Sequence, residues 1–232
     1  MKTAVIVSAD GEWKAVKGLL RPNSDRREGP WETFTTELEG RALQFVHGGW
    51  GKVSAAASAQ FVIDHMRPDL LVNIGTCGGL KGRIEQGTIV LVERTLIYDI
   101  LEQMTDSEAA LEHYSTVLDL TWLPNSLPMP VKRGLLASAD RDIVPADTDV
   151  LAAVHGAVAA DWESGAIAWV AGRNRQRLLI LRGVTDLVSP EGGEAYGNYE
   201  LFLARTREIM QRLVESLPKW LDAIQPALAM SA

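Results

Sequence analysis

Four short apolar runs constrain this chain more than any other feature of its sequence. They are rich in Val, Ile and Leu and are continuous rather than alternating: Thr3–Val7, Leu70–Ile74, Thr88–Val92 and Leu178–Leu181. A strand with one solvated face alternates apolar and polar residues, so continuous runs of this length are typical of strands covered on both faces. The chain should therefore fold around a largely buried sheet with helices on both sides.

The first helix is predicted within residues 52–66, where Val53, Ala57 and Phe61 recur at four-residue spacing. This spacing places the three side chains in one apolar stripe. His65 continues the stripe, and we expect it to be a core or helix-end residue rather than a ligand.

Two further helices complete the pattern. One is predicted from Glu163 to Val170, and the other ends at Pro218, because proline cannot continue the helical hydrogen bonding. Residues 31–38 and 41–47, joined by Glu39-Gly40, predict an antiparallel pair. The sequence thus predicts an α/β fold over residues 1–232. It should be a single domain with a central mixed, mostly parallel sheet flanked by helices.

Composition excludes several classes of protein. Thirty acidic residues against 23 basic ones give a net charge of −7, which argues against binding to nucleic acid. The lone cysteine, Cys77, cannot form an internal disulfide, and no Cys/His spacing indicates a metal site. No apolar run approaches the roughly 18 residues of a membrane span, and Met1–Ser8 is too short for a signal peptide. We expect a cytoplasmic protein without a bound metal or cofactor and without a membrane partner.

Polar side chains follow the apolar runs, where the carboxyl ends of parallel strands form the ligand site of an open α/β sheet. They are Glu12, Thr76, Asp161, Glu163, Arg182, Thr185 and Asp186. Several carboxylates and one arginine at a single rim suit acid/base chemistry on a neutral or cationic intermediate.

Each of these residues also has a purely structural interpretation. Glu12 and Glu163 are favoured as charges at helix N-termini, and Asp186 as a helix or turn cap. The glycine-rich segment Gly75–Gly79 lacks the spacing of a dinucleotide fingerprint, so it is either a tight turn after a strand or a ligand cradle. Cys77, without a histidine partner pattern, is interpreted as structural.

Six segments, in this order, carry a resemblance to a known family. They are Ser8-Ala-Asp-Gly-Glu-Trp13, Gly48-Gly-Trp-Gly-Lys-Val53, Asn73-Ile-Gly-Thr-Cys-Gly-Gly-Leu80, Ser138-Ala-Asp140, Ala160-Asp-Trp-Glu-Ser-Gly-Ala166 and Leu181-Arg-Gly-Val-Thr-Asp186. Together they resemble the nucleoside phosphorylase and nucleosidase superfamily, most of all its 5′-methylthioadenosine/S-adenosylhomocysteine nucleosidases. The resemblance covers nearly the whole chain and implies a nucleoside phosphorylase-like fold and a nucleoside substrate.

The resemblance also implies roles for the catalytic residues. Glu12 would activate a water molecule that Thr76 and Arg182 help to hold near the anomeric carbon. Glu163 would bind the ribose hydroxyls. Asp186 would protonate ring nitrogen seven of the purine as it leaves.

The remaining substrate contacts follow from the same resemblance. Gly78 would border the substrate, Trp162 would line the sugar or base pocket, and the backbone of Ile143 would read the base edge. Trp50, Met104 and either Tyr196 or Tyr199 are candidates for the pocket around the 5′ substituent.

Two departures bear on the activity. Phosphorylases of the superfamily use arginines to clamp phosphate, but residues 8–12 contain none, and Asn73 stands where the other is expected. Water is therefore the predicted nucleophile. Asp142 occupies the position of an aromatic residue that stacks on adenine, so either Trp162 stacks instead or the base is not adenine.

The leading hypothesis is a nucleosidase that hydrolyses 5′-substituted adenosines. The alternatives are a phosphate-dependent phosphorylase and a nucleoside-binding protein without turnover. The relatives also imply a homodimer, and the apolar residues between 120 and 129 are candidates for its interface.

Overall fold

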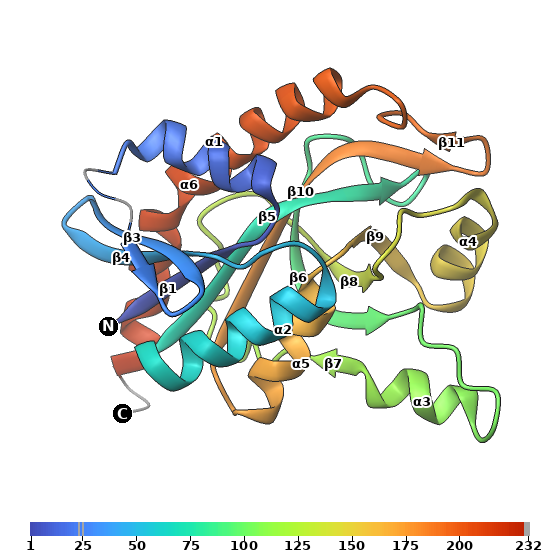
Figure 1. Cartoon of the computed structure of the whole chain (residues 1–232), viewed down its shortest axis with the longest axis horizontal. Coiled ribbons are helices and arrows are strands. Elements are labelled where there is room, and N and C mark those ends of the chain that lie inside the picture. Colours follow the sequence, from blue (N-terminus) through green and yellow to red (C-terminus); the bar gives the residue numbers. More distant parts are fainter. Residues whose placement is uncertain (23, 25, 230–232) are drawn as a thin grey trace.

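One mixed sheet organises the part of the chain that the computed structural model describes, residues 1–22, 24 and 26–229 (Figure 1). Its strands are β1 (Thr3–Val7), β2 (Arg26–Glu28), β3 (Trp31–Leu38), β4 (Arg41–His47), β5 (Leu70–Leu80), β6 (Ile89–Ile97), β7 (Ser115–Val117), β8 (Lys132–Ser138), β9 (Ala157–Asp161), β10 (Leu178–Ser189) and β11 (Gly192–Gly193). All four apolar runs form strands, as predicted. The α/β fold with a central mixed sheet flanked by helices is confirmed.

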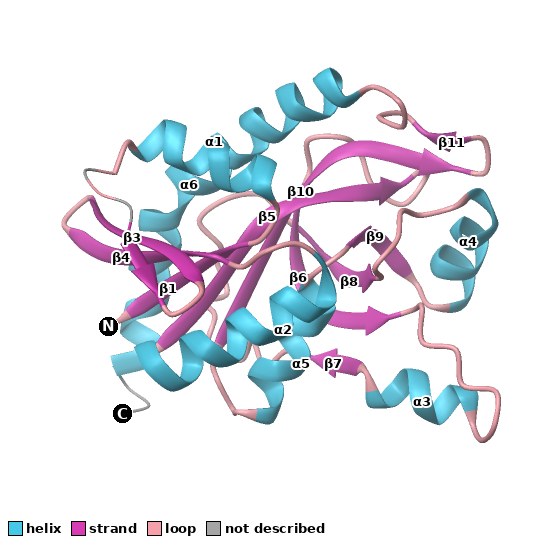
Figure 2. Cartoon of the chain, in the orientation of Figure 1, coloured by secondary structure: helices cyan, strands magenta, loops and turns pink. Residues whose placement is uncertain are grey.

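The helices lie between the strands and on both faces of the sheet (Figure 2). They are α1 (Asp10–Leu20), α2 (Gly51–Phe61), α3 (Ser107–His113), α4 (Pro145–Asp149), α5 (Ser164–Arg173) and α6 (Tyr199–Ala229), with single π-helical segments η1 (Val62–Met66) and η2 (Val150–Val154). None of the described helices combines the length and the apolar character needed to cross a membrane.

The pairing of the strands closes part of the sheet on itself. β5 pairs with β10, β10 with β6, β6 with β8, β8 with β9, and β9 again with β5. On the other side of β5 the sheet stays open through β1, β4, β3 and β2. The predicted antiparallel pair of β3 and β4 is present.

A β-bulge interrupts the longest parallel pair. Arg182 pairs with Gly75 and Val184 with Cys77, but Asp186 pairs with Gly78, so Thr185 is an extra residue in β10. Because side chains alternate along a strand, one extra residue turns those that follow to the opposite face. The bulge therefore directs Asp186 away from the face that carries Arg182.

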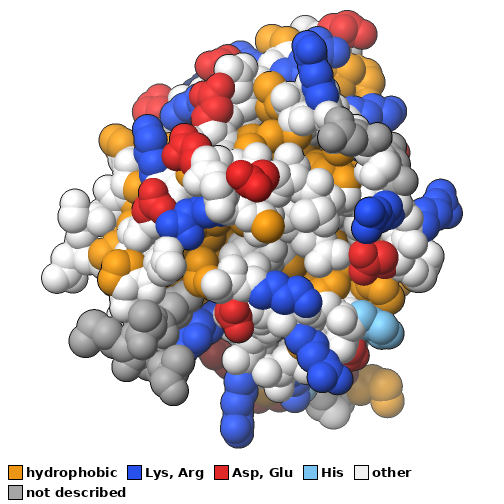
Figure 3. Space-filling model, turned by 90° about the vertical axis from the view of Figure 1, so that its left-hand side faces the viewer, with side chains coloured by type: hydrophobic (Ala, Val, Ile, Leu, Met, Phe, Trp, Pro, Cys, Tyr) orange, Lys and Arg blue, Asp and Glu red, His pale blue; other side chains and the backbone are white. Residues whose placement is uncertain are grey.

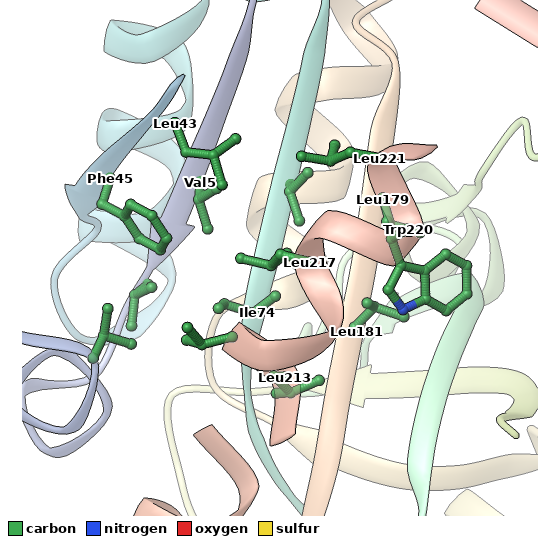
Figure 4. Close-up of a cluster of buried hydrophobic side chains, with 14 of the residues drawn as sticks. Val5, Leu43, Phe45, Ile74, Leu179, Leu181, Leu213, Leu217, Trp220 and Leu221 are labelled. Carbon is green, nitrogen blue, oxygen red and sulfur yellow. The ribbon is translucent and has the colours of Figure 1, made fainter. Parts of the chain in front are cut away.

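Two apolar cores cover the two faces of the sheet. Helices α1 and α6 pack on one face, where Leu213, Leu217, Trp220 and Leu221 of α6 lie over β1, β5 and β10 (Figure 4). Helices α2 and α5 pack on the other face. Because both faces are covered, the strands of the centre need no polar side, which explains their continuous apolar runs.

The stripe predicted for the first helix is wrong. Val53 is 81% exposed, and the buried residues of α2 are Gly51, Ala55, Ser58 and Ala59. Small side chains allow the helix to approach its neighbours closely, which four-residue apolar spacing does not reveal. His65 is exposed at the end of η1, with Nδ1 3.1 Å from the carbonyl oxygen of Phe61, so it is a helix-end residue.

The predicted end of the last helix at Pro218 is also wrong, because α6 continues to Ala229. A proline inside a helix costs about 3 kcal/mol. Beyond it, Trp220, Leu221 and Ile224 are almost fully buried against the sheet. Each such burial contributes about 1.5–3 kcal/mol, so tertiary packing outweighs the cost of the proline.

The segment from 120 to 129 is not a free apolar surface. Trp122 is buried in the core, and Leu120, Leu123, Leu127 and Met129 pack against it. The segment therefore exposes less apolar surface than expected, and its role as a subunit interface stays a prediction.

Candidate active site

A cavity of about 780 Å³ opens where α1, β5, β9, β10 and the start of α6 meet. Its size is within the range typical of small-molecule sites. The predicted site residues that line it are Glu12, Trp50, Thr76, Gly78, Ile143, Trp162, Glu163 and Asp186. Arg182 does not line the cavity; its guanidinium lies next to Glu12 in the protein interior.

Glu12 lies in the first turn of α1, as its helix-charge interpretation requires, and it also faces the cavity. Its Oε1 accepts two hydrogen bonds from Thr76, one from the backbone N–H at 2.5 Å and one from Oγ1 at 2.8 Å. The backbone N–H of Ala9 donates to Oε2 at 3.3 Å. These donors fix the carboxylate in one orientation.

Arg182 is completely buried and stands behind this carboxylate. Its Nη1 lies 3.6 Å from Oε1 of Glu12, and its Nη2 donates to Oδ1 of Asn73 at 2.8 Å. Its Nε lies 3.0 Å from Oδ2 of Asp161 and donates to Oγ of Ser164 at 2.9 Å. Asn73, at a position expected to hold a phosphate-binding arginine, is thus a partner of Arg182.

The support around Arg182 includes residues that the sequence did not single out. Oγ of Ser138 donates to Asp161 at 2.6 Å, and Oγ of Ser164 donates to the other carboxylate oxygen at 2.5 Å. Both serines lie within motifs quoted for the resemblance, but no role was predicted for either. Only the fold reveals that they converge on Asp161.

The glycine-rich segment is not a turn after a strand, because Gly75–Gly79 lies inside β5. Of the two alternatives, its position favours a ligand cradle, since Thr76, Cys77 and Gly78 line the cavity. A Cβ at Gly75 would lie 2.0 Å from Nη1 of Arg182 and 2.8 Å from Oε1 of Glu12. Glycine is required here because the buried ion pair occupies the space of a side chain.

Glu163 is the N-cap residue of α5, and its side chain reaches across to another element. Its Oε1 accepts a hydrogen bond from the backbone N–H of Gly51 at 3.1 Å. Burial, assisted by the nearby carboxylate of Asp161, raises the pKa of Glu163 to about 8. Beside it, the rings of Trp50 and Trp162 pack with centroids 4.7 Å apart. Trp50 remains 65% exposed.

Asp186 lies inside β10, so its interpretation as a helix or turn cap is wrong. Burial raises the pKa of its carboxyl group. Oγ1 of Thr185 donates to Oδ1 at 2.7 Å. Asp186 is thus a fixed, partly desolvated acid on the cavity wall.

Cys77 is buried, and burial raises the pKa of its thiol well above the ordinary value. A thiol in this state is a poor nucleophile. Among the described residues, no group of three or more His, Cys, Asp or Glu side chains is placed so as to hold a metal ion.

Charged groups at the cavity are predominantly acidic. Among the described residues that line the cavity, Arg141 is the one arginine. Its guanidinium donates two hydrogen bonds to the carboxylate of Asp147, at 2.6 and 3.1 Å. Asp142, next to it, is exposed at the cavity. On the face of the molecule shown in Figure 3, acidic and basic side chains are interspersed rather than gathered into one basic patch.

The fold and the cavity define an α/β protein whose small-molecule site is built from carboxylates. The chain belongs to the Phosphorylase superfamily, whose family profile matches residues 2–218.

Individual relatives agree with this assignment. A 5′-methylthioadenosine/S-adenosylhomocysteine nucleosidase of Halalkalibacterium halodurans is 25% identical over 213 residues, which cover 87% of this chain and 91% of the relative. The solved structure of the nucleosidase of the same name from S. pneumoniae has a TM-score of 0.73 at 20% identity, covering 97% of this chain and all of the other. A futalosine hydrolase mutant of Helicobacter pylori has a TM-score of 0.76 at 14% identity, covering 94% of this chain and all of the other.

Proposed function

We propose that this protein is a purine nucleosidase that hydrolyses the N-glycosidic bond of 5′-substituted adenosines such as 5′-methylthioadenosine or S-adenosylhomocysteine. The observation that carries the proposal is the meeting of Glu12, Glu163 and Asp186 in one cavity. The curated relative named above supports the same substrate class.

The chemistry of the bond explains why acids are needed at two places. Its cleavage leaves positive charge on the ribose and negative charge on the departing purine, much as in glycoside hydrolysis. Asp186, whose pKa is raised by burial, is suited to donate a proton to the purine. Such a positioned acid contributes about 10²–10⁴-fold to the rate.

Glu12 is suited to act at the sugar. Thr76 fixes its Oε1, and Arg182 lies behind it without reaching the cavity. In the proposed reaction Glu12 takes a proton from water as it attacks the anomeric carbon. Glu163 binds the ribose hydroxyls, and Trp162 covers the sugar.

Water is favoured over phosphate as the nucleophile by the charges at the site. A phosphate dianion requires fixed cationic donors. Arg182 is bound to Asp161 and Asn73 behind the cavity wall, and Arg141 is bound to Asp147.

The direct test is release of free base by purified protein in phosphate-free buffer. The substrates are 5′-methylthioadenosine, S-adenosylhomocysteine, 5′-deoxyadenosine and adenosine. Release of base from none of them would refute the substrate class, and a rate that requires phosphate would identify a phosphorylase instead. Binding of an adenosine analogue without release of base would identify a nucleoside-binding protein.

We also propose that the protein is a homodimer. Trp50, Val53 and Met104 are large apolar side chains that are 65%, 81% and 93% exposed in the single chain. Sedimentation equilibrium measures the mass directly, and a monomer at micromolar concentration would contradict this proposal.

A further inference from the structure

An ion pair outside the cavity stands behind the strand segment that carries Asp186. Arg205 lies near the start of α6, and Glu194 lies in the short stretch between β11 and α6. Nη1 of Arg205 is 3.4 Å from Oε2 of Glu194. Neither residue is among the described residues that line the cavity, so the pair can act on a ligand only through other groups.

The pair binds the peptide groups on both sides of Asp186. Nη1 of Arg205 donates to the carbonyl oxygen of Thr185 at 3.0 Å. The backbone N–H of Leu187 donates to Oε2 of Glu194 at 3.4 Å, and the backbone N–H of Glu194 donates to the carbonyl oxygen of Leu187 at 3.1 Å. Because the extra residue of a bulge has no partner in the strand ladder, the carbonyl group of Thr185 needs such a donor.

The helix that carries Arg205 is itself fixed against this strand. A Cβ at Gly183 would lie 2.2 Å from Cγ2 of Ile209, so only glycine permits this contact between strand and helix. Gly183 lies two residues before the bulge, and Ile209 lies one helical turn after Arg205. The guanidinium therefore starts from a defined position beside Thr185.

The two charges of the pair act on the acid in opposite directions. Burial is the largest influence on the pKa of Asp186 and raises it. Of the nearby charges, the cation of Arg205 lowers this pKa and the carboxylate of Glu194 raises it. Removal of either charge should therefore be detectable at Asp186.

Other ionisable groups near the acid are neutral, paired or exposed to solvent. Burial raises the pKa of the Cys77 thiol and of the Tyr196 hydroxyl, which both interact with Asp186, so both are neutral at pH 7. At the neighbouring rim, Arg141 is bound to Asp147, and Asp142 is exposed.

We propose that Arg205 is a positioning residue for Asp186, which it holds toward the cavity by binding the bulge at Thr185. Glu194 secures the arginine and the strand on the far side of the acid. This inference rests on the proposed function, which gives Asp186 its task as the acid.

The first test is the variant Arg205→Met, which keeps a long side chain and removes the cation and its donors. Misplacement of a reacting group by about 1 Å costs up to about 10²-fold, so kcat for 5′-methylthioadenosine should fall about 10–100-fold. KM should change little, because the pair does not line the cavity. Arg205→Lys, which keeps the charge and one donor, should recover most of kcat.

Arg212→Met is the matched control. Arg212 lies on the same helix, and its Nη1 donates to the backbone carbonyl of Gly87 at 2.6 Å, away from the bulge. This variant should keep kcat within about twofold of the wild type. A loss in Arg205→Met no larger than in this control would overturn the inference.

The second test follows the ionisation of Asp186 itself by carbon NMR of protein labelled at the aspartate carboxyl groups. The signal is assigned by its absence in Asp186→Asn. Arg205→Met should raise the pKa of Asp186, and Glu194→Gln should lower it, because one change removes a cation and the other an anion. A merely structural role would leave this pKa unchanged or move it in the same direction in both variants, and either result would overturn the inference.

The two tests separate this inference from the proposed function. If the wild type cleaves no nucleoside, the proposed function fails, but the opposite displacements of the Asp186 pKa still decide whether the pair acts on this carboxyl group. If Arg205→Met does not fold, Arg205→Lys and Glu194→Gln provide the comparison. A pKa of Asp186 that does not fall in Glu194→Gln would then refute the role of the pair.

Discussion

Replacement of Arg182 by methionine tests the buried charge network most directly. Methionine is similar in length but has no hydrogen-bond donors. The change removes the cation that lies 3.0 Å from Asp161 and 3.6 Å from Glu12, and the donor to Asn73. Two buried carboxylates then remain without their cation.

The expected loss of stability is large. Breaking a buried ion pair by removing one partner costs about 3–5 kcal/mol, because the remaining charge stays buried without compensation. Typical domains are stable by only about 5–15 kcal/mol in total. At about 2–4 °C per kcal/mol for a chain of this size, the Tm should fall by roughly 6–20 °C.

Urea and thermal unfolding, followed by circular dichroism, measure this change. The matched control is Arg133→Met, which removes an arginine that pairs with Glu93 at 2.7 Å while both side chains are 45% exposed. An exposed pair of this kind is worth about 0–1 kcal/mol, so the control should unfold nearly as the wild type does. A loss of less than about 1 kcal/mol in Arg182→Met would show that the network does not stabilise the fold.

Three further predictions concern single side chains. Asp186→Asn keeps the shape and removes the acid, so the rate of base release should fall at least about 10²-fold, and a loss below about tenfold would exclude the acid role. Burial raises the pKa of Glu163 to about 8, above its unfolded value of about 4.3, so its contribution to stability is greatest at low pH and is lost as pH rises toward 8. In urea unfolding the wild type should therefore lose more stability than Glu163→Gln between pH 5 and 8.5, and equal losses would contradict this pKa. Gly75→Ala should destabilise the protein by about 1–3 kcal/mol or more, because its Cβ would overlap Arg182. Gly18→Ala, in α1 with open space around it, should instead be neutral or stabilising, and the reverse order in thermal unfolding would refute the overlap argument.

The strands could be predicted because their apolar runs reflect burial on both faces, which is a local property of the sequence. The grouping of Glu12, Glu163 and Asp186 could be predicted for a related reason, since polar residues that follow the apolar runs of one sheet meet at one side of it. Asp186 nevertheless lies inside β10, because this strand continues beyond its apolar run to Ser189. The chemical roles of the three acids remain predictions that the experiments above address.

Other features depend on packing between distant segments. Position 75 of β5 must be glycine because a buried guanidinium occupies the space of a side chain there. Pro218 lies inside a helix because the residues beyond it are buried. Tyr196 was predicted only as one of several candidates near the 5′ substituent. Its hydrogen bond to Ile143 spans 53 positions of the chain, and no local pattern indicates it.

Because Thr185 is an extra residue in β10, the number of residues before Asp186, and not their chemical type, sets the face of the sheet toward which its carboxyl group points. Deleting one residue between Val184 and Asp186 would rotate the carboxyl group toward the core beneath α2 and α5, although every acid of the site would still be present. Variation in this stretch should therefore tolerate exchanges of residue type far better than changes of length.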